Sequence, residues 1–225
     1  MNATLFIETS GPYCSLALRA GGEDFVESRL LNRSHNENVL LMIDSLYARA
    51  GLDRLATNVI GFSAGPGSFT GVRIGAAVSQ AIAFAADARV VPIESSLVLT
   101  MTAARQFQLK EWLAIIKSRK NLFYCTHYSA GSSMGLPIHE TELFDSSPAW
   151  LREITEPIGI VGDRPPWLED HWVDVHYSGV YPEANSVLDL VERIHREGNS
   201  RSAEHALPIY LEADSPWVKE SDQNI

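Results

Sequence analysis

The segment Gly65–Gly75, which reads GPGSFTGVRIG, carries the strongest chemical pattern in this sequence. Its glycines and proline predict a tight loop over 65–71 that ends at the N-terminus of a helix, where free backbone amides and the helix dipole favour an anion. The segment is not a P-loop, because no Lys-Ser or Lys-Thr pair follows the last glycine. Two interpretations stay open: a structural turn that lets the helix pack closely, and a ligand-binding loop.

A single carboxylate, Glu8, ends the first apolar run beside Thr9 and Ser10. At that position it could orient a metal-bound water or a phosphate. The alternative is a solvated or salt-bridged strand end. His35 stands in the first turn of an expected helix, but the residue four positions on is Val39. A helical metal site with two histidines on one face is therefore not expected.

The remaining reactive side chains show weaker patterns. Cys14 and Cys125 have no histidine beside them and are expected to be inert buried thiols. A Gly-x-Ser-x-Gly nucleophile motif and a dinucleotide-binding glycine pattern do not occur. His171 and His176 lie near Asp170 and Asp174, but their spacing matches no standard metal site, so surface positions are expected. We therefore expect no cofactor and no metal.

Composition limits the class of protein. The chain has 225 residues, two cysteines and a net charge of −10, and most of the acidic excess follows residue 100. Few cysteines and no visible signal peptide favour a reducing, cytoplasmic location, and no membrane span is expected. Such acidity repels a polyanion such as tRNA, so any direct tRNA contact should be minor, with a partner making most phosphate contacts.

The first half predicts three antiparallel strands followed by alternating helices and strands. The expected strands are 5–9, 13–19, 25–30, 59–63 and 90–93, and the expected helices are 35–50, 72–86 and about 95–106. Ser34 and Glu37 fit a capping box at the start of the first helix, and Gly51 is a plausible stop.

Two of these helices are more apolar than one sheet requires. Leu40, Leu41, Met42 and Ile43 are consecutive and so point around the whole first helix. In the second helix Gly71, Gly75, Ser79 and Ala83 form a ridge of small side chains, which lets another backbone approach closely. We therefore expect both helices to be covered by a second polypeptide.

The second half repeats this theme less clearly. The expected strands are 111–116, 122–128, 138–144, 158–161 and 173–177, with a short helix over 148–154, a longer one over 185–197 and an apolar segment at 208–211. We place a domain boundary near residue 105, which divides the chain into lobes of residues 1–105 and 106–225.

The order LFIETS, SLAL, a helix opening with SH, GFSAGPGSFTGVRIG and a late PIYL resembles the TsaB (YeaZ) family. The resemblance is dense over residues 4–95 and thin beyond residue 100. It implies an actin-like ASKHA fold of the α/β class with two lobes. It also implies a non-catalytic dimerisation subunit of the machinery that forms N6-threonylcarbamoyladenosine at position 37 of tRNA. The implied partners are a TsaD-like catalytic subunit and a TsaE-like ATPase, with a homodimer when the chain is alone.

The resemblance also implies that pairing uses the first two helices. The expected interface residues are His35, Val39, Leu41, Met42, Gly71, Arg73, Gly75, Ala77, Val78, Ser79 and Ile82. A large charged residue at Ala77 or Ser79 should then abolish pairing without unfolding the protomer. Three positions depart from the family pattern: Glu8 stands where Asp is usual, Lys117 where an acid is usual, and Glu212 where a basic residue is common.

Two enzymatic alternatives stay open beside this subunit role. One is an active nucleotide-dependent transferase or kinase that uses Glu8 and the 65–71 loop. The other is a peptidase, for which neither a nucleophile–base pair nor a two-histidine metal motif is visible.

Overall fold

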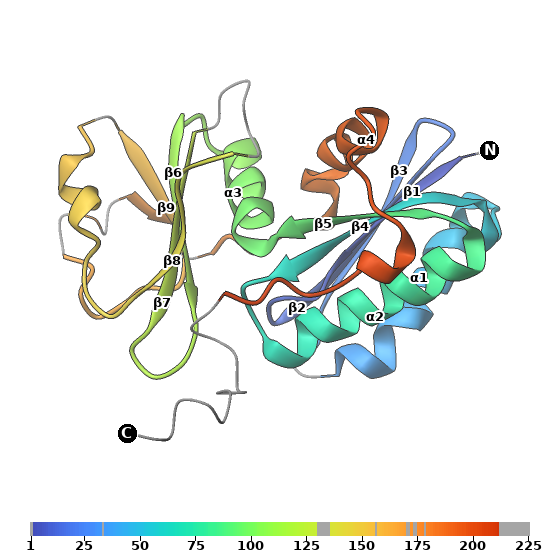
Figure 1. The fold of residues 1–225 in the computed structure, drawn as a ribbon, viewed down its shortest axis with the longest axis horizontal. Coiled ribbons are helices and arrows are strands. Elements are labelled where there is room, and N and C mark those ends of the chain that lie inside the picture. Colours follow the sequence, from blue (N-terminus) through green and yellow to red (C-terminus); the bar gives the residue numbers. More distant parts are fainter. Residues whose placement is uncertain are drawn as a thin grey trace, which may run out of the picture.

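A computed structural model describes residues 2–211 except 33, 130–135, 156, 170, 171, 173, 174 and 178. The chain forms two mixed β-sheets with helices packed on and between them (Figure 1). The expected α/β class with two sheets is therefore confirmed. The weak histidine–aspartate cluster expected at 170–176 lies largely outside the described residues.

The first sheet has the order β3-β2-β1-β4-β5. Its strands are β1 (Ala3–Glu8), β2 (Tyr13–Ala20), β3 (Glu23–Leu30), β4 (Thr57–Gly65) and β5 (Arg89–Glu94). β1, β2 and β3 pair antiparallel, whereas β4 pairs parallel to both β1 and β5. The predicted antiparallel opening is confirmed, and the parallel strands follow because a helix crosses over between them.

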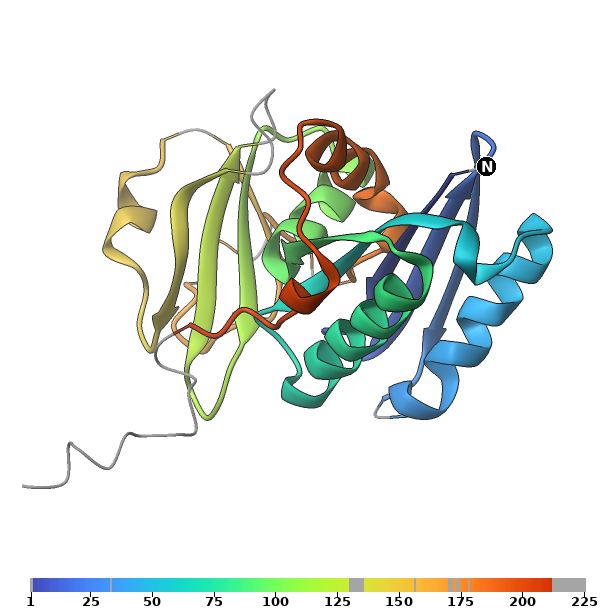
Figure 2. The same ribbon diagram turned by 45° about the vertical axis from the view of Figure 1, so that its right-hand side comes forward.

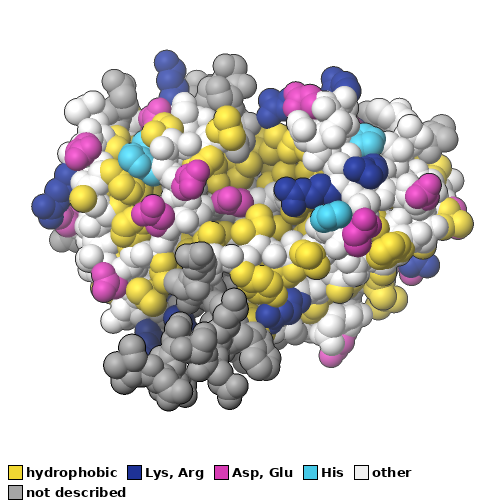
Figure 3. Space-filling view, in the orientation of Figure 1, with side chains coloured by type: hydrophobic (Ala, Val, Ile, Leu, Met, Phe, Trp, Pro, Cys, Tyr) yellow, Lys and Arg dark blue, Asp and Glu magenta, His cyan; other side chains and the backbone are white. Residues whose placement is uncertain are grey.

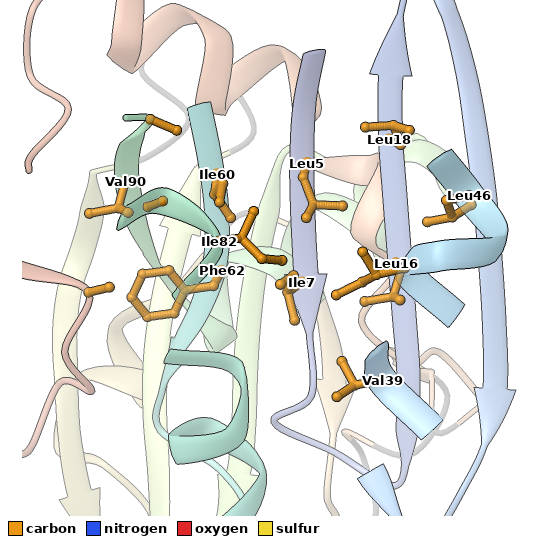
Figure 4. Close-up of a cluster of buried hydrophobic side chains, with 14 of the residues drawn as sticks. Leu5, Ile7, Leu16, Leu18, Val39, Leu46, Ile60, Phe62, Ile82 and Val90 are labelled. Atoms are coloured by element: carbon orange, nitrogen blue, oxygen red, sulfur yellow. The ribbon is translucent and has the colours of Figure 1, made fainter. Parts of the chain in front are cut away.

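Helices α1 (His35–Ala50) and α2 (Phe69–Ala86) lie side by side on one face of this sheet (Figures 1 and 2). Val39 and Leu46 of α1 and Ile82 of α2 point at strand residues such as Leu16 and Ile7 in one buried cluster (Figure 4). Gly51 ends α1 in the left-handed conformation, as predicted.

The starts of both helices correct the sequence predictions. Ser34 does precede α1, but its hydroxyl donates to the carbonyl of Leu31 at 3.0 Å, and its side chain does not cap the helix, so the predicted capping box is wrong. Helix α2 begins at Phe69 rather than Val72, because the side chain of Ser68 accepts a hydrogen bond from the Gly71 amide and caps the helix.

The second sheet has the order β10-β9-β6-β7-β8. Its strands are β6 (Glu111–Lys117), β7 (Phe123–Ser129), β8 (Pro137–Phe144), β9 (Ile158–Gly162) and β10 (His176–Tyr177). The helix expected over 148–154 is a 3₁₀ helix at Ala149–Glu153. Of the described residues in the strand expected over 173–177, His176 and Tyr177 pair parallel to β9, whereas residues 173 and 174 lie outside the described residues.

Helix α3 (Ser95–Gln106) lies between the two sheets (Figure 1). Leu97 and Val98 pack into the cluster of the first sheet, while Leu99 and Ala103 pack with Trp112 of the second. One helix therefore closes a face of each sheet.

The C-terminal part of the chain returns to the first sheet. Helix α4 (Leu188–Arg196) and the 3₁₀ helix at Ala184–Ser186 cover the face opposite α1 and α2, where Val187 and Val191 meet Phe6 and Val59. The lobe boundary near residue 105 stays a prediction, but this segment of the expected second lobe packs on the first sheet, where it covers Phe6 and Val59.

Candidate functional site

The glycine loop is held in place by the turn between β1 and β2. The Ser68 amide donates to the carbonyl oxygen of Ser10 at 2.7 Å, and a side chain at Gly67 would lie 2.6 Å from that same oxygen. At the other end of the loop, the Thr9 hydroxyl donates to the Gly71 carbonyl at 2.8 Å. The loop therefore rests directly on residues 9 and 10.

The ridge of small residues on α2 faces the protein's own sheet. A Cβ added at Gly71 would overlap the carbonyl oxygen of Thr9, and one added at Gly75 would lie 2.6 Å from the Thr9 hydroxyl oxygen. Ser79 and Ala83 of the same ridge are also buried. Close backbone approach, expected from these residues, therefore occurs with the end of β1 within one chain.

Glu8 is buried, with 1% of its surface exposed. Its Oε1 accepts from both the amide and the hydroxyl of Ser10 at 2.6 Å each, and its Oε2 accepts from the hydroxyl of Ser63. Burial raises the pKa of Glu8 above its ordinary value, against the opposing effect of these hydrogen bonds. The carboxylate is thus enclosed by protein donors and does not present itself to a metal–nucleotide complex.

His35 is also buried, and its Nε2 lies 3.2 Å from the carbonyl oxygen of Tyr13. It joins α1 to the start of β2. Across the described part of the chain, no group of three or more His, Cys, Asp or Glu side chains could hold a metal ion. The two cysteines are buried, and burial raises the pKa of each thiol to about 12.

A cleft of about 1150 Å³ opens between the two sheets. The 65–71 loop and the 10–12 turn line one side, the 115–119 and 162–163 segments line the other, and 208–211 crosses at the edge. Lys117 and Arg119 are exposed on the second-sheet side, where Asp163 also lines the cleft. Glu8 is not among the residues that line this cleft.

The outer faces of α1 and α2 carry exposed apolar side chains. Leu40 and Leu41 of α1 are 47% and 64% exposed, and Phe84 of α2 is 62% exposed. Ala77 and Ala81 of α2 are exposed as well. Figure 3 shows hydrophobic side chains at the surface over this half of the molecule. We call these residues, namely Leu40, Leu41, Ala77, Ala81 and Phe84, the outer apolar face.

The structure divides the predicted interface set. The members on the surface or half-buried are Leu41, Arg73, Ala77 and Val78. The buried members are His35, Val39, Met42, Gly71, Gly75, Ser79 and Ile82. The interface itself stays a prediction, but the buried members reach a partner only through the helices that they position. A charged residue at Ser79 would enter the core, so the expected intact protomer applies to Ala77 alone.

Sequence reasoning missed Phe84 and Leu40 as surface residues. Phe84 could have been found, because Ala77, Ala81 and Phe84 recur at helical spacing on the side opposite the small-residue ridge. By length and composition α2 could cross a membrane, since its 18 residues have a mean hydropathy of 1.3. The sequence analysis expected no membrane span, so α2 is an exception to that expectation. Many apolar residues of α2 pack on β4 in the buried cluster of the first sheet.

Comparison with known proteins points in one direction. A family model described as "TsaD: tRNA N6-adenosine threonylcarbamoyltransferase" matches residues 26–138. The protein named tRNA threonylcarbamoyladenosine biosynthesis protein TsaB is 39% identical in Haemophilus influenzae, over 55% of this chain and 52% of that one. The Escherichia coli K12 protein of the same name is 27% identical over 96% of both chains.

Solved structures agree in the fold. The structure titled "YeaZ from Pseudomonas aeruginosa" superposes with a TM-score of 0.81 at 25% identity, covering 94% of this chain and all of that one. A second structure, titled as similar to peptidase YeaZ from the same organism, has a TM-score of 0.83 at 26% identity. The two mixed sheets are thus of the actin-like ASKHA type, as expected.

Proposed function

The chain belongs to the TsaB (YeaZ) family, and from this membership we propose that it is the non-catalytic partner subunit of a tRNA-modifying complex. Its role lies in tRNA threonylcarbamoyladenosine biosynthesis. In this proposal the chain pairs with a TsaD-like catalytic subunit that forms N6-threonylcarbamoyladenosine at position 37, and a TsaE-like ATPase joins them. The location is cytoplasmic.

The outer apolar face is the observation that carries this proposal. Leu40, Leu41 and Phe84 are large apolar side chains exposed to solvent, although the helices that carry them are otherwise well packed on their sheet. Isolated exposed leucines are ordinary, but several on two adjacent helices fit a helix-to-helix interface. Four consecutive apolar residues in α1 are thereby explained, since Met42 and Ile43 face the sheet and Leu40 and Leu41 face outward.

The exposed apolar side chains of this face set the energetic scale of the proposed pairing. A specific interface buries about 1,200 Å² or more in total, and a fully buried leucine or phenylalanine contributes roughly 1.5–3 kcal/mol. The small outer residues Ala77 and Ala81 let a partner helix approach α2 closely. A second copy of the chain can use the same face when the catalytic subunit is absent, which gives a homodimer.

The subunit acts on the reaction by holding its partner in a competent conformation. One observation supports this indirect role over catalysis by the chain itself. Glu8 is enclosed by hydrogen bonds from Ser10 and Ser63. The net charge of −10 supports a partner subunit that makes most of the tRNA phosphate contacts.

The test is binding of purified chain to a TsaD-like subunit from the same organism, measured by calorimetry. Leu41→Glu and Ala77→Glu should each lower affinity by about a hundredfold or more, because each buries an unpaired charge. Leu136→Glu is the matched control, since Leu136 is 75% exposed beside β8 of the second sheet. Equal affinity of all three variants would exclude the outer apolar face, and metal-dependent ATP turnover by the isolated chain that Glu8→Ala abolishes would favour an enzyme.

A further inference from the structure

Glu8 connects to the start of α2 through a continuous series of hydrogen bonds. Its Oε1 accepts hydrogen bonds from both the amide and the hydroxyl of Ser10. These two hydrogen bonds fix the turn after β1. The carbonyl oxygen of Ser10 in turn accepts a 2.7 Å hydrogen bond from the Ser68 amide. Ser68 caps α2 by accepting from the Gly71 amide. The start of α2 is therefore placed by the turn that Glu8 holds.

A second contact beside the first makes this placement specific. Thr9, between Glu8 and Ser10, donates its hydroxyl to the Gly71 carbonyl at 2.8 Å, and its own carbonyl touches Gly71 so closely that a Cβ there would overlap it. A shift of the 9–10 backbone must therefore move the first turn of α2. Because a helix is stiff, the displacement carries along to Ala77 and Phe84 on its outer side.

The other carboxylate oxygen anchors Glu8 to the sheet. Oε2 accepts from the Ser63 hydroxyl in β4, the strand that leads directly into the glycine loop. One side chain thus joins β4 to the β1–β2 turn, and both segments meet α2. No ligand is needed to explain a buried carboxylate with three protein donors.

We propose that Glu8 is a positioning residue that sets the placement of α2, and with it the fit of the outer apolar face to its partner. The effect on partner binding rests on the proposed function. The placement of α2 by Glu8 within the chain does not. Glutamine has the same length and can still accept from Ser10, whereas aspartate is one methylene shorter and cannot span Ser10 and Ser63. Alanine leaves the Ser10 amide and the Ser63 hydroxyl without this acceptor.

The experiment measures two quantities on Glu8→Gln, Glu8→Asp and Glu8→Ala. The first is affinity for the TsaD-like subunit, at a temperature well below each variant's midpoint of thermal unfolding. The second is amide hydrogen exchange over residues 68–72 in the isolated chain. Leu113→Ala is the control, because it opens a cavity in the buried cluster of the second sheet, far from α2.

We expect Glu8→Gln to bind within about threefold of wild type, and Glu8→Asp and Glu8→Ala to bind about tenfold or more weakly, which is about 1.4 kcal/mol. Exchange over 68–72 should speed up in the same order. Leu113→Ala should lower the midpoint without changing affinity or exchange at 68–72. The proposal is overturned if Glu8→Asp binds like wild type while Glu8→Gln does not, or if Leu113→Ala weakens binding equally.

These arms separate the two proposals. If wild-type chain does not bind the TsaD-like subunit, the proposed function fails, and exchange over 68–72 alone decides whether Glu8 positions α2. If wild type binds but none of the Glu8 variants changes either quantity, only the positioning role fails.

Discussion

The Nε atom of Arg73 donates a 3.0 Å hydrogen bond to the hydroxyl of Tyr210, at the far end of the described chain. The same guanidinium lies over the Phe69 ring, with its Cζ 3.2 Å from the ring centroid. The segment that carries Tyr210 also pairs with β4, since the Ile209 amide donates to the Ala64 carbonyl at 2.8 Å. One side chain of α2 thus holds the segment that borders the cleft.

Removing the Tyr210 hydroxyl should loosen that segment. In Tyr210→Phe we expect faster hydrogen exchange at the Ile209 amide, with a fall in the free energy of unfolding of no more than about 1 kcal/mol. Tyr181→Phe, elsewhere in the lining of the cleft, should leave exchange at Ile209 unchanged. Equal exchange in wild type and Tyr210→Phe would show that the hydrogen bond does not hold the segment.

A methyl group at Gly71 should destabilise the protein although alanine favours helices. Gly71→Ala would normally gain about 1 kcal/mol in a helix, but its Cβ would overlap the Thr9 carbonyl oxygen. Backbone must then move, and we expect a net loss of about 1–3 kcal/mol in chemical unfolding. Gly11→Ala is the matched control, since a Cβ there meets nothing within 4 Å. A stabilised Gly71→Ala protein would contradict the packing described here.

The buried carboxyl of Glu8 predicts a pH dependence of stability. Burial raises the pKa of Glu8 above its ordinary value of 4.5, so the folded chain binds this proton more tightly than the unfolded chain. The stabilisation from the neutral carboxyl is fully present below about pH 4.5 and is lost as pH rises through the folded-state pKa.

Glu8→Gln removes this titration. Its stability relative to wild type should therefore increase as pH rises above about 4.5, as measured by urea unfolding of both proteins between about pH 4 and pH 8. A difference between the two proteins that stays constant over this range would mean that Glu8 titrates alike in the folded and unfolded chain.

Both thiols should resist modification in the folded protein. Burial raises the pKa of Cys14 and Cys125 to about 12, and for Cys14 the charge of Glu8 acts in the same direction. Thiolate is the reactive form, so Ellman's reagent at about pH 8 should react slowly with native protein and release both equivalents after denaturation. A rapid reaction of one thiol in native protein would place that cysteine at the surface.

The sequence predicted the elements well where the pattern was local. Alternation in β2 and the Gly51 stop of α1 were enough to place those features. The start of α2 was missed by three residues because the cap is Ser68, which stands inside a glycine-rich loop and follows no apolar run. The capping box failed because the Ser34 hydroxyl bonds backward to Leu31 instead of forward into the helix.

Which face each helix turns to a neighbour could be predicted only in part. Leu40–Ile43 correctly indicated that α1 has apolar residues on two sides. The small ridge on α2 indicated close approach, but the pattern is the same whether the neighbour is Thr9 or another protein. The sequence could not exclude a ligand-binding role for Glu8. The donors that enclose it, Ser10 and Ser63, come together only when β1 and β4 pair.

The return of α4 to the first sheet has a consequence for synthesis of the chain. As the polypeptide leaves the ribosome, β1, β4 and β5 can pair early and α3 can cover part of the face around Phe6 and Val59, but the rest of that face stays open until residues 184–196 emerge. A product truncated before that point would expose this surface and tend to aggregate. Completion of the N-terminal half therefore waits for the C-terminal half to be translated.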